Sequence, residues 1–262
     1  MSISFDRIAT RYDTTRGFPP GVDAQIGAAF RRQSGLPGGA RLLEIGVGTG
    51  RIAIPLASQG YRYIGVDISV EMMRRLRERL PQDTAVSLLR GDATALPLRD
   101  ASVDGAITVH VFHLIAGWEL AVAELQRVIQ PGGTLAVGFN DVGEPPPAER
   151  LRERWRAIVH ELGGDTRRPG ATKEQLDPLL ETLFGPPRRV VLATWQRRES
   201  LRERLDMIAS RTHSDAWEVP EPILHESLGR VEEWARDTYG DLESPHTFEA
   251  NFTMLFYQKR ET

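Results

Sequence analysis

The feature that most constrains this fold is a regular alternation of strand and helix patterns over the first 140 residues. Strand patterns occupy residues 40–45, 61–67, 85–89, 103–109 and 133–139, and helical spacing fills the segments between them. Strands that are joined through helices pair in parallel, because a crossover must return the chain to the same end of the sheet. The first half therefore predicts an α/β fold with a doubly wound, mostly parallel sheet.

The second half of the chain is mainly helical, and two further strand patterns bring the predicted sheet to seven strands. These strands are expected at 189–195 and 248–256, and amphipathic helices surround them. A length of 262 residues fits one large domain with insertions. We predict a cofactor-binding core with an N-terminal lid segment at 1–140. Helical insertions at 141–171 and 199–246 are expected to cap the carboxyl edge of the sheet. The remaining core helix and strands are expected at 172–198 and 247–262.

Composition excludes several classes of function. The chain has 36 acidic and 33 basic residues, a net charge of −3, which argues against a nucleic-acid partner. It has no cysteine, so disulfides, thiolate metal sites and cysteine nucleophiles are excluded, and its histidines lack ligand spacing, so no metal is expected. No signal peptide or long apolar run is present, which predicts a cytoplasmic protein without a membrane partner. The oligomeric state cannot be read from the sequence.

A glycine-rich turn joins the first strand to the next helix. Its sequence, GVGTG at 46–50, allows the backbone to approach a ligand closely, and the helix that follows offers unpaired N–H groups. A dinucleotide-binding fingerprint requires glycine or alanine at position 51, where this chain has Arg51. Taken alone, the turn also fits a plain connection between strand and helix.

Two carboxylates follow the next two strands. Asp67 ends the second strand, where a carboxylate can accept hydrogen bonds from both hydroxyls of a ribose, and Asp92 follows the third. Each has an alternative interpretation: Asp67 as a charge near a helix N-terminus, and Asp92 as a turn residue. Because parallel strands end at one edge, the two carboxylates and the glycines are expected to lie together.

Five segments in this order resemble the class I S-adenosylmethionine-dependent methyltransferases, in particular the small-molecule branch of type 11 and ubiquinone-biosynthesis enzymes. They are FDRIATRYD at 5–13, LLEIGVGTGR at 42–51, GVDIS at 65–69, GDATALPL at 91–98 and ELQRVIQPGG at 124–133. The resemblance covers residues 5–140 and implies S-adenosylmethionine as cofactor. It also implies that Gly46 and Gly48 pass beside the methionine part, and that Glu44 places its ammonium group.

The same resemblance implies contacts to the rest of the cofactor. Asp67 would hold the ribose, with Ile68 and Met72 against the adenine. Asp92 would accept from the adenine amino group, while the backbone N–H of Ala93 reaches the ring. From the N-terminal segment, Tyr12 and Arg16 would fold over the methionine end, although Tyr12 also fits a packing residue and Arg16 a solvated one.

Methyl transfer needs alignment and exclusion of water, and it needs a base only for some acceptors. Two histidines, His110 and His113, follow the fourth strand, and each also fits a satisfied residue of a helix or loop. Because the resembling enzymes often carry histidine in this region, the resemblance makes His113 the candidate catalytic base, and His110 is expected to line the methyl path with its backbone. The predicted function is methyl transfer to a small-molecule acceptor by in-line displacement. The alternatives are a nicotinamide-dependent oxidoreductase, which Arg51 and Asp92 disfavour, and a non-catalytic cofactor-binding regulator.

Overall fold

The computed structural model describes residue 6, residues 16–82 and residues 84–261, and these divide into two compact units. The sheet unit comprises the chain up to Asn140, Pro169–Thr194 and the segment from Asn251 onwards. The helical unit comprises Asp141–Arg168 and Trp195–Ala250. These two segments overlap the insertions predicted at 141–171 and 199–246. It stays a prediction that their helices cap the carboxyl edge of the sheet.

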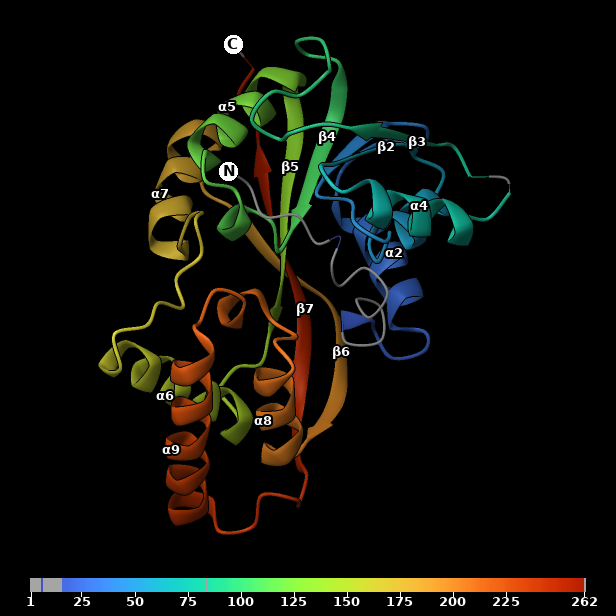
Figure 1. Cartoon of the computed structure of the whole chain (residues 1–262). Helices are drawn as coiled ribbons and strands as arrows, with labels where there is room; N and C mark the ends of the chain where they lie inside the picture. Colours follow the sequence, from blue (N-terminus) through green and yellow to red (C-terminus); the bar gives the residue numbers. More distant parts are fainter. Residues whose placement is uncertain (1–5, 7–15, 83, 262) are drawn as a thin grey trace. The chain divides into compact units, whose positions relative to one another are not determined.

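The sheet has seven strands, as the sequence predicts, in the order β3-β2-β1-β4-β5-β7-β6 (Figure 1). Four neighbouring pairs, from β3 to β5, are parallel. The chain runs outward from β1 to β3 and then returns to the other side of β1 with β4, so the direction of winding reverses at β1. The strands are β1 (Arg41–Ile45), β2 (Arg62–Asp67), β3 (Val86–Arg90), β4 (Val103–Val109), β5 (Ile129–Asp141), β6 (Arg188–Glu199) and β7 (His246–Gln258).

The last three strands are longer than the sequence predicts. Strand β5 starts at Ile129, whereas the Pro131-Gly132 pair predicts a turn before residue 133. The pair is accommodated inside the strand because the register against β4 shifts there. Gly133 allows this close pairing, since a Cβ on it would lie 2.8 Å from the Asp104 carbonyl oxygen.

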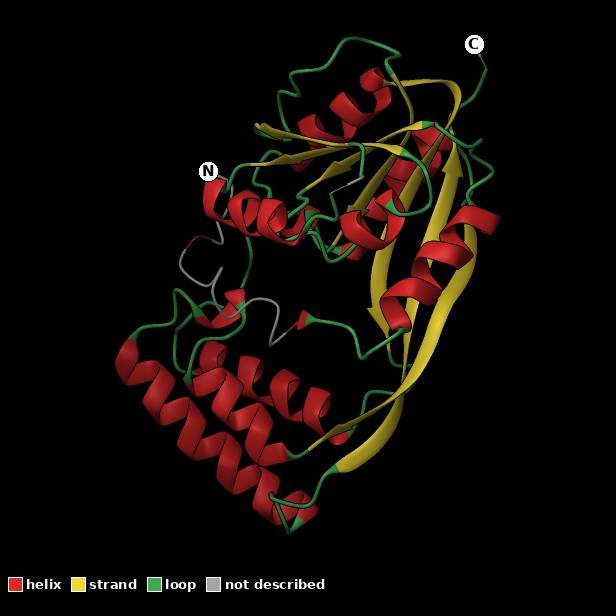
Figure 2. Ribbon diagram, turned by 90° about the vertical axis from the view of Figure 1, so that its right-hand side faces the viewer, coloured by secondary structure: helices red, strands yellow, loops and turns green. Residues whose placement is uncertain are grey.

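Helices cover both faces of the sheet (Figures 1 and 2). On one face, α5 (Trp118–Val128) and α7 (Lys173–Phe184) bury their apolar sides in a core shared with β1 and β4. On the other lie α2 (Val22–Gln33), α3 (Ala53–Ala57) and α4 (Val70–Arg79). A serine directly before an apolar helical repeat predicts an N-cap, and Ser69 has this role at the start of α4, because its Oγ accepts a hydrogen bond from the Met72 N–H at 3.1 Å.

The helical unit has an apolar core of its own. The helices α6 (Pro147–Glu161), α8 (Leu201–Ala209) and α9 (Glu221–Tyr239) pack around Trp155, which is fully buried. The indole N–H of Trp155 donates to the Ser227 Oγ at 3.0 Å, so the polar atom of this side chain is satisfied inside the core. Trp155 therefore belongs to the packing of this unit.

Two buried ion-pair groups also hold the helical unit together. Arg152 and Arg156, one turn apart on α6, both bind the Asp215 carboxylate, at 2.9 and 2.7 Å. Their charges hold the pKa of Asp215 well below its usual range, although burial acts in the opposite direction. In the second group, Arg204 lies between Glu199 and Glu149. Such pairs specify how the helices meet, because an unpaired charge there would be costly.

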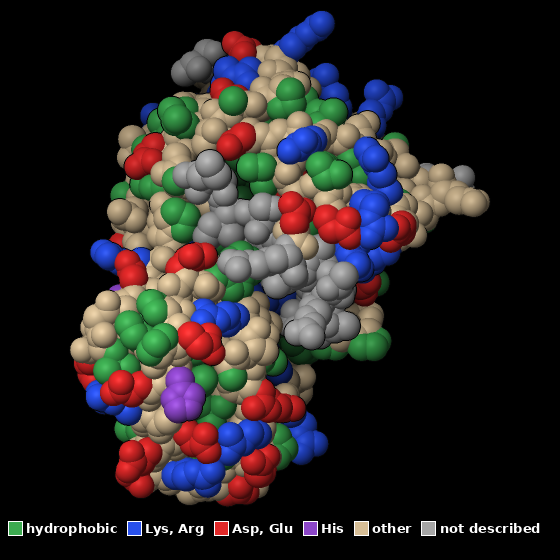
Figure 3. Space-filling view, viewed as in Figure 1, with side chains coloured by type: hydrophobic (Ala, Val, Ile, Leu, Met, Phe, Trp, Pro, Cys, Tyr) green, Lys and Arg blue, Asp and Glu red, His purple; other side chains and the backbone are tan. Residues whose placement is uncertain are grey.

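The described surface mixes charges of both signs. Figure 3 shows Lys or Arg beside Asp or Glu over most of the visible face. Exposed partners such as Arg74 and Glu71 on α4 form hydrogen-bonded pairs. In the part of the chain that the structure describes, no helix is both long and apolar enough to cross a membrane.

Candidate functional site

The carboxyl ends of four neighbouring strands bring most of the predicted site residues to one edge of the sheet unit. Strand β1 is followed by Gly46, β2 ends at Asp67, β3 is followed by Asp92 and β4 by His110. The register places Ile45 beside both Val66 and Thr108, so these strand ends are level. The edge also contains the point where the winding reverses, which is where open α/β sheets bind ligands.

The glycine-rich loop turns sharply at this edge because its glycines adopt left-handed backbone angles. Gly46 and Gly48 have φ values of +68° and +55°, and the Gly46 N–H donates to the Val66 carbonyl at 2.8 Å. A Cβ on Gly46 would lie 2.4 Å from a methyl group of Val111, the residue after His110. The loop therefore lies so close to the β4 end that a side chain at position 46 would clash, and glycine avoids this clash.

Asp67 links the glycine loop to the start of α4. One of its carboxylate oxygens accepts the Gly48 N–H at 2.8 Å, and the other accepts the Ser69 N–H at 2.8 Å. Burial raises the pKa of Asp67, while hydrogen bonds from the backbone of Ser69, Gly48 and Ile68 act to lower it. A carboxylate has about four lone-pair positions, so acceptor capacity remains for a further donor.

Apolar and polar groups flank this carboxylate. Met72 is buried, and its terminal methyl group lies where a Cβ on Gly48 would be in ordinary contact at 3.5 Å. Ile68 and Ala93 are half-buried. One oxygen of Asp92 accepts both the N–H and the hydroxyl of Thr94, at 3.0 and 2.9 Å. Asp92 thus has the role of a turn residue, which is the alternative interpretation given above. Its second carboxylate oxygen accepts no hydrogen bond from a described residue.

Glu44 lies in β1, two residues before the glycine-rich loop. The sequence patterns do not indicate a hydrogen-bond partner for its side chain. The side chain is 2% exposed, and one carboxylate oxygen accepts the Tyr63 phenol O–H at 2.6 Å. Burial raises the pKa of Glu44 to about 8. Tyr63 is a residue that the sequence analysis missed, because its polar end reaches Glu44 from the neighbouring strand.

Arg51 is a second residue whose role the sequence did not reveal. Its guanidinium donates to the Arg16 carbonyl oxygen at 2.9 Å and lies 4.6 Å from the centre of the Phe18 ring. The residue that breaks the dinucleotide fingerprint therefore ties the segment at residues 16–18 to the glycine loop. The Arg16 side chain is half-buried there, and Tyr12 lies outside the described residues.

Replacing Arg51 tests this tie. We expect Arg51→Met to speed tryptic cleavage after Arg16 and to lower the affinity for the cofactor that the sequence predicts by up to about 30-fold, because a hydrogen bond and a cation–π contact of ~1 kcal/mol each are lost. The measurements are timed proteolysis and calorimetry. Arg51→Lys is the matched control. Because it keeps the positive charge, its cleavage rate and affinity should lie between those of wild type and Arg51→Met. Equal cleavage rates and affinities in wild type and Arg51→Met would contradict this role.

The two histidines occupy different positions after β4. His110 has a left-handed backbone, with φ of +55°, and its Nε2 accepts the Asn140 N–H at 3.3 Å. His113 lies in the short helix η2 (Phe112–Leu114), and its carbonyl oxygen accepts the Gly170 N–H at 3.1 Å. A Cβ on Gly170 would lie 1.9 Å from the Phe112 carbonyl oxygen, so only glycine allows this backbone contact. The contact fixes the backbone that carries His113.

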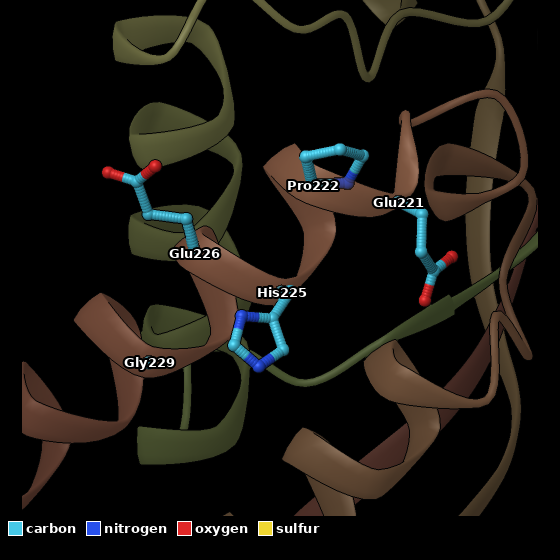
Figure 4. A pocket seen from close by; sticks show the side chains of 5 residues that line it. All are labelled: Glu221, Pro222, His225, Glu226 and Gly229. Atoms are coloured by element: carbon cyan, nitrogen blue, oxygen red, sulfur yellow. The ribbon is translucent and has the colours of Figure 1, made fainter.

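A separate hollow on the helical unit has no comparable chemistry. It is lined by Glu221, Pro222, His225, Glu226 and Gly229, all from α9. Figure 4 shows the side chains of Glu221, His225 and Glu226 pointing in different directions. The two carboxylates already bind Arg211 and Arg230, at 2.8 and 2.6 Å. The strand ends of the sheet unit are therefore the stronger candidate site.

Comparisons with known proteins identify relatives of this chain. A family model described as a methyltransferase domain matches residues 43–137. The chain is 33% identical over 165 residues to a ubiquinone/menaquinone biosynthesis C-methyltransferase of Syntrophotalea carbinolica, covering 61% of this chain and 70% of that protein. It is 34% identical over 190 residues to a malonyl-acyl-carrier-protein O-methyltransferase of Methylococcus capsulatus, covering 68% of this chain and 67% of that protein.

A solved structure extends the likeness to most of the chain. The YcgJ protein of Bacillus subtilis matches with a TM-score of 0.58 and covers 91% of this chain and 99% of its own. The sequence identity is 18%, so this match concerns the fold alone. The seven-stranded, doubly wound architecture is thus shared with that protein.

Proposed function

Because the chain belongs to the class I S-adenosylmethionine-dependent methyltransferases, we propose that it transfers a methyl group to a small-molecule acceptor by in-line displacement at the carboxyl edge of its sheet unit. The bound cofactor supplies an electrophilic sulfonium methyl group and departs as a neutral thioether. The residues of the chain must hold the cofactor, align the acceptor and exclude water. Membership of this family also decides against the nicotinamide alternative.

The observation that carries the proposal is the hydrogen bond from the Gly48 N–H to Asp67. It sets the glycine loop and a carboxylate with spare acceptor positions side by side. Asp92 adds a carboxylate oxygen without a described donor, and Met72 adds an apolar surface. This combination suits a ribose, an amino-substituted ring and the apolar faces of that ring.

We assign the residues accordingly. Asp67 accepts from the ribose hydroxyls, Asp92 accepts from the adenine amino group, and Ala93 offers its backbone N–H. Ile68 and Met72 lie against the adenine. The backbone of Gly46 and Gly48 passes the methionine part, Glu44 places the ammonium group, and Arg16, with its fixed charge, suits the carboxylate. That Tyr12 folds over the methionine end stays a prediction from the sequence.

The acceptor is proposed to be a small molecule, with the methylated atom left open. The two curated relatives are named as methylating carbon and oxygen, respectively. A carbon or hydroxyl acceptor must lose a proton, whereas a neutral amine need not. We propose that His113 is the base where one is needed and that His110 lines the methyl path with its backbone. A cytoplasmic location also stays a prediction from the sequence.

The test of this function is transfer of label from methyl-labelled S-adenosylmethionine to a panel of carbon, oxygen and nitrogen acceptors below protein size. We expect labelled product and equimolar S-adenosylhomocysteine with at least one acceptor class. Cofactor binding without turnover across such a panel favours the alternative of a non-catalytic regulator. Failure to bind the cofactor at all would contradict the proposal.

His113→Ala tests the base. We expect turnover to fall about 100-fold or more with a carbon or hydroxyl acceptor, in line with typical contributions of general bases. The affinity for S-adenosylmethionine should stay within twofold, since the assigned cofactor contacts do not include this imidazole. His225→Ala, an exposed histidine on α9, is the matched control and should leave turnover unchanged. Unchanged turnover in His113→Ala would remove this residue from the mechanism.

A further inference from the structure

Glu44 is a buried acid whose only described hydrogen-bond donor is neutral. It precedes Gly46 by two residues and is 2% exposed, and the Tyr63 phenol donates to it at 2.6 Å. No described residue forms an ion pair with this carboxyl group. Removing an ionised carboxylate from water without a cation is costly, so the free protein favours the protonated acid.

The groups around Glu44 act on its pKa in both directions, and the rise caused by burial prevails. Burial is the largest influence and raises its pKa to about 8, and the charge of Asp67 acts in the same direction. The Tyr63 hydrogen bond and the charge of Arg51 oppose this rise. On the β4 side, the register neighbour is Ile107, which does not titrate. Burial also raises the pKa of Tyr63 well above its usual value, so the phenol remains a donor.

We propose that Glu44 and Tyr63 couple cofactor binding to release of a proton: Glu44 is a protonated acid in the free protein and ionises, losing its proton to solvent, when the cationic cofactor binds. This inference rests on the proposed function. The cofactor brings positive charge, and a cation near a carboxyl group favours the ionised form. Tyr63 donates to Glu44 before and after, and its hydrogen bond strengthens once the acceptor is charged. Tyr63 is thus a positioning residue that acts through Glu44.

The coupling gives a defined pH dependence. Below pH 8 the fraction of free protein with ionised Glu44 rises with pH, since the pKa is about 8. The affinity for S-adenosylmethionine should therefore rise by up to about tenfold per pH unit from pH 6 towards pH 8 and fall at higher pH, where the amino group of the cofactor loses its charge. Tyr63→Phe removes a hydrogen bond that lowers this pKa, so its affinity maximum should lie at higher pH.

Calorimetric titration with S-adenosylmethionine measures the coupling directly. At pH 7, titrations in phosphate and in Tris, which differ in ionisation enthalpy, give the number of protons released per cofactor bound. We expect about 0.5–1 proton for wild type and near zero for Glu44→Gln, which cannot ionise. The amino group of the cofactor titrates at about pH 8 as well, so at pH 7 it is about nine-tenths protonated and can change the proton count by only about 0.1 in either protein.

The outcomes separate this inference from the proposed function. Equal proton release by wild type and Glu44→Gln, or an affinity that does not change between pH 6 and 8, overturns the coupling and leaves the methyltransferase function intact. If wild type does not bind S-adenosylmethionine at any pH, the proposed function is contradicted, and the coupling that rests on it is contradicted as well. If Glu44→Gln does not fold, Tyr63→Phe decides: an affinity maximum shifted to higher pH supports the coupling, and an unshifted profile overturns it.

Discussion

Asp67→Ala is expected to reduce the affinity for S-adenosylmethionine at least about a hundredfold, a loss of ~3 kcal/mol or more, because each hydrogen bond to a charged acceptor contributes about 1.5–3 kcal/mol. The substitution removes the proposed ribose acceptor. It also leaves the Gly48 and Ser69 N–H groups without the oxygens that they bind at 2.8 Å. Calorimetry measures the affinity, and circular dichroism checks that the fold persists.

Asp100→Ala is the matched control for this substitution. Its carboxylate is 80% exposed and pairs with Arg127 away from the strand ends, so the affinity should stay within twofold of wild type. The stability of Asp67→Ala should change less than its affinity, because burial of the carboxylate, which raises its pKa, offsets part of what its hydrogen bonds contribute. A wild-type affinity in Asp67→Ala would contradict the assignment of the site.

Trp155→Ala is expected to lower the unfolding free energy of the helical unit by about 3–5 kcal/mol, the usual cost of truncating a large buried aromatic side chain. Trp155 is fully buried among the helices of that unit, and its indole N–H is bonded to Ser227. Differential scanning calorimetry should show that the helical unit unfolds at a lower temperature than in wild type. Since the assigned cofactor contacts all belong to the sheet unit, S-adenosylmethionine should still bind with an affinity within threefold of wild type.

Arg154→Ala is the control on the same helix, since its side chain is 40% exposed. We expect it to change stability by less than about 0.5 kcal/mol, as surface substitutions usually do. Loss of cofactor binding in Trp155→Ala, with the sheet unit still folded, would contradict the assignment of the cofactor contacts to that unit.

The parts of the site that could be predicted from the sequence are those fixed by local rules. A strand pattern followed by glycines or an aspartate marks the end of a parallel strand, and all such ends meet at one edge. Ser69 as a helix N-cap was predictable for the same reason, because its partner, Met72, is three residues away. The first five strands followed from the alternation of strand and helix patterns and the last two from strand patterns of their own, although β5 starts at Ile129, earlier than its pattern predicts.

The remaining features depend on contacts between residues far apart in the chain. Tyr63 meets Glu44 only because β2 lies beside β1. Arg51 was read only as a departure from a glycine motif, yet its guanidinium holds the segment at residues 16–18. Gly170 fixes the backbone of His113 from a segment that follows α6, and no sequence pattern indicates that approach.

The most direct test of the central claim is thermal unfolding of the wild-type protein with S-adenosylmethionine, S-adenosylhomocysteine and NAD in parallel. A ligand at about 100 times its dissociation constant stabilises the folded state by ~2.7 kcal/mol, which raises the midpoint by roughly 5–10 °C in a chain of this size. We predict such a rise with the two sulfur compounds and none with NAD. A rise with NAD alone, or with none of the three, would contradict the account.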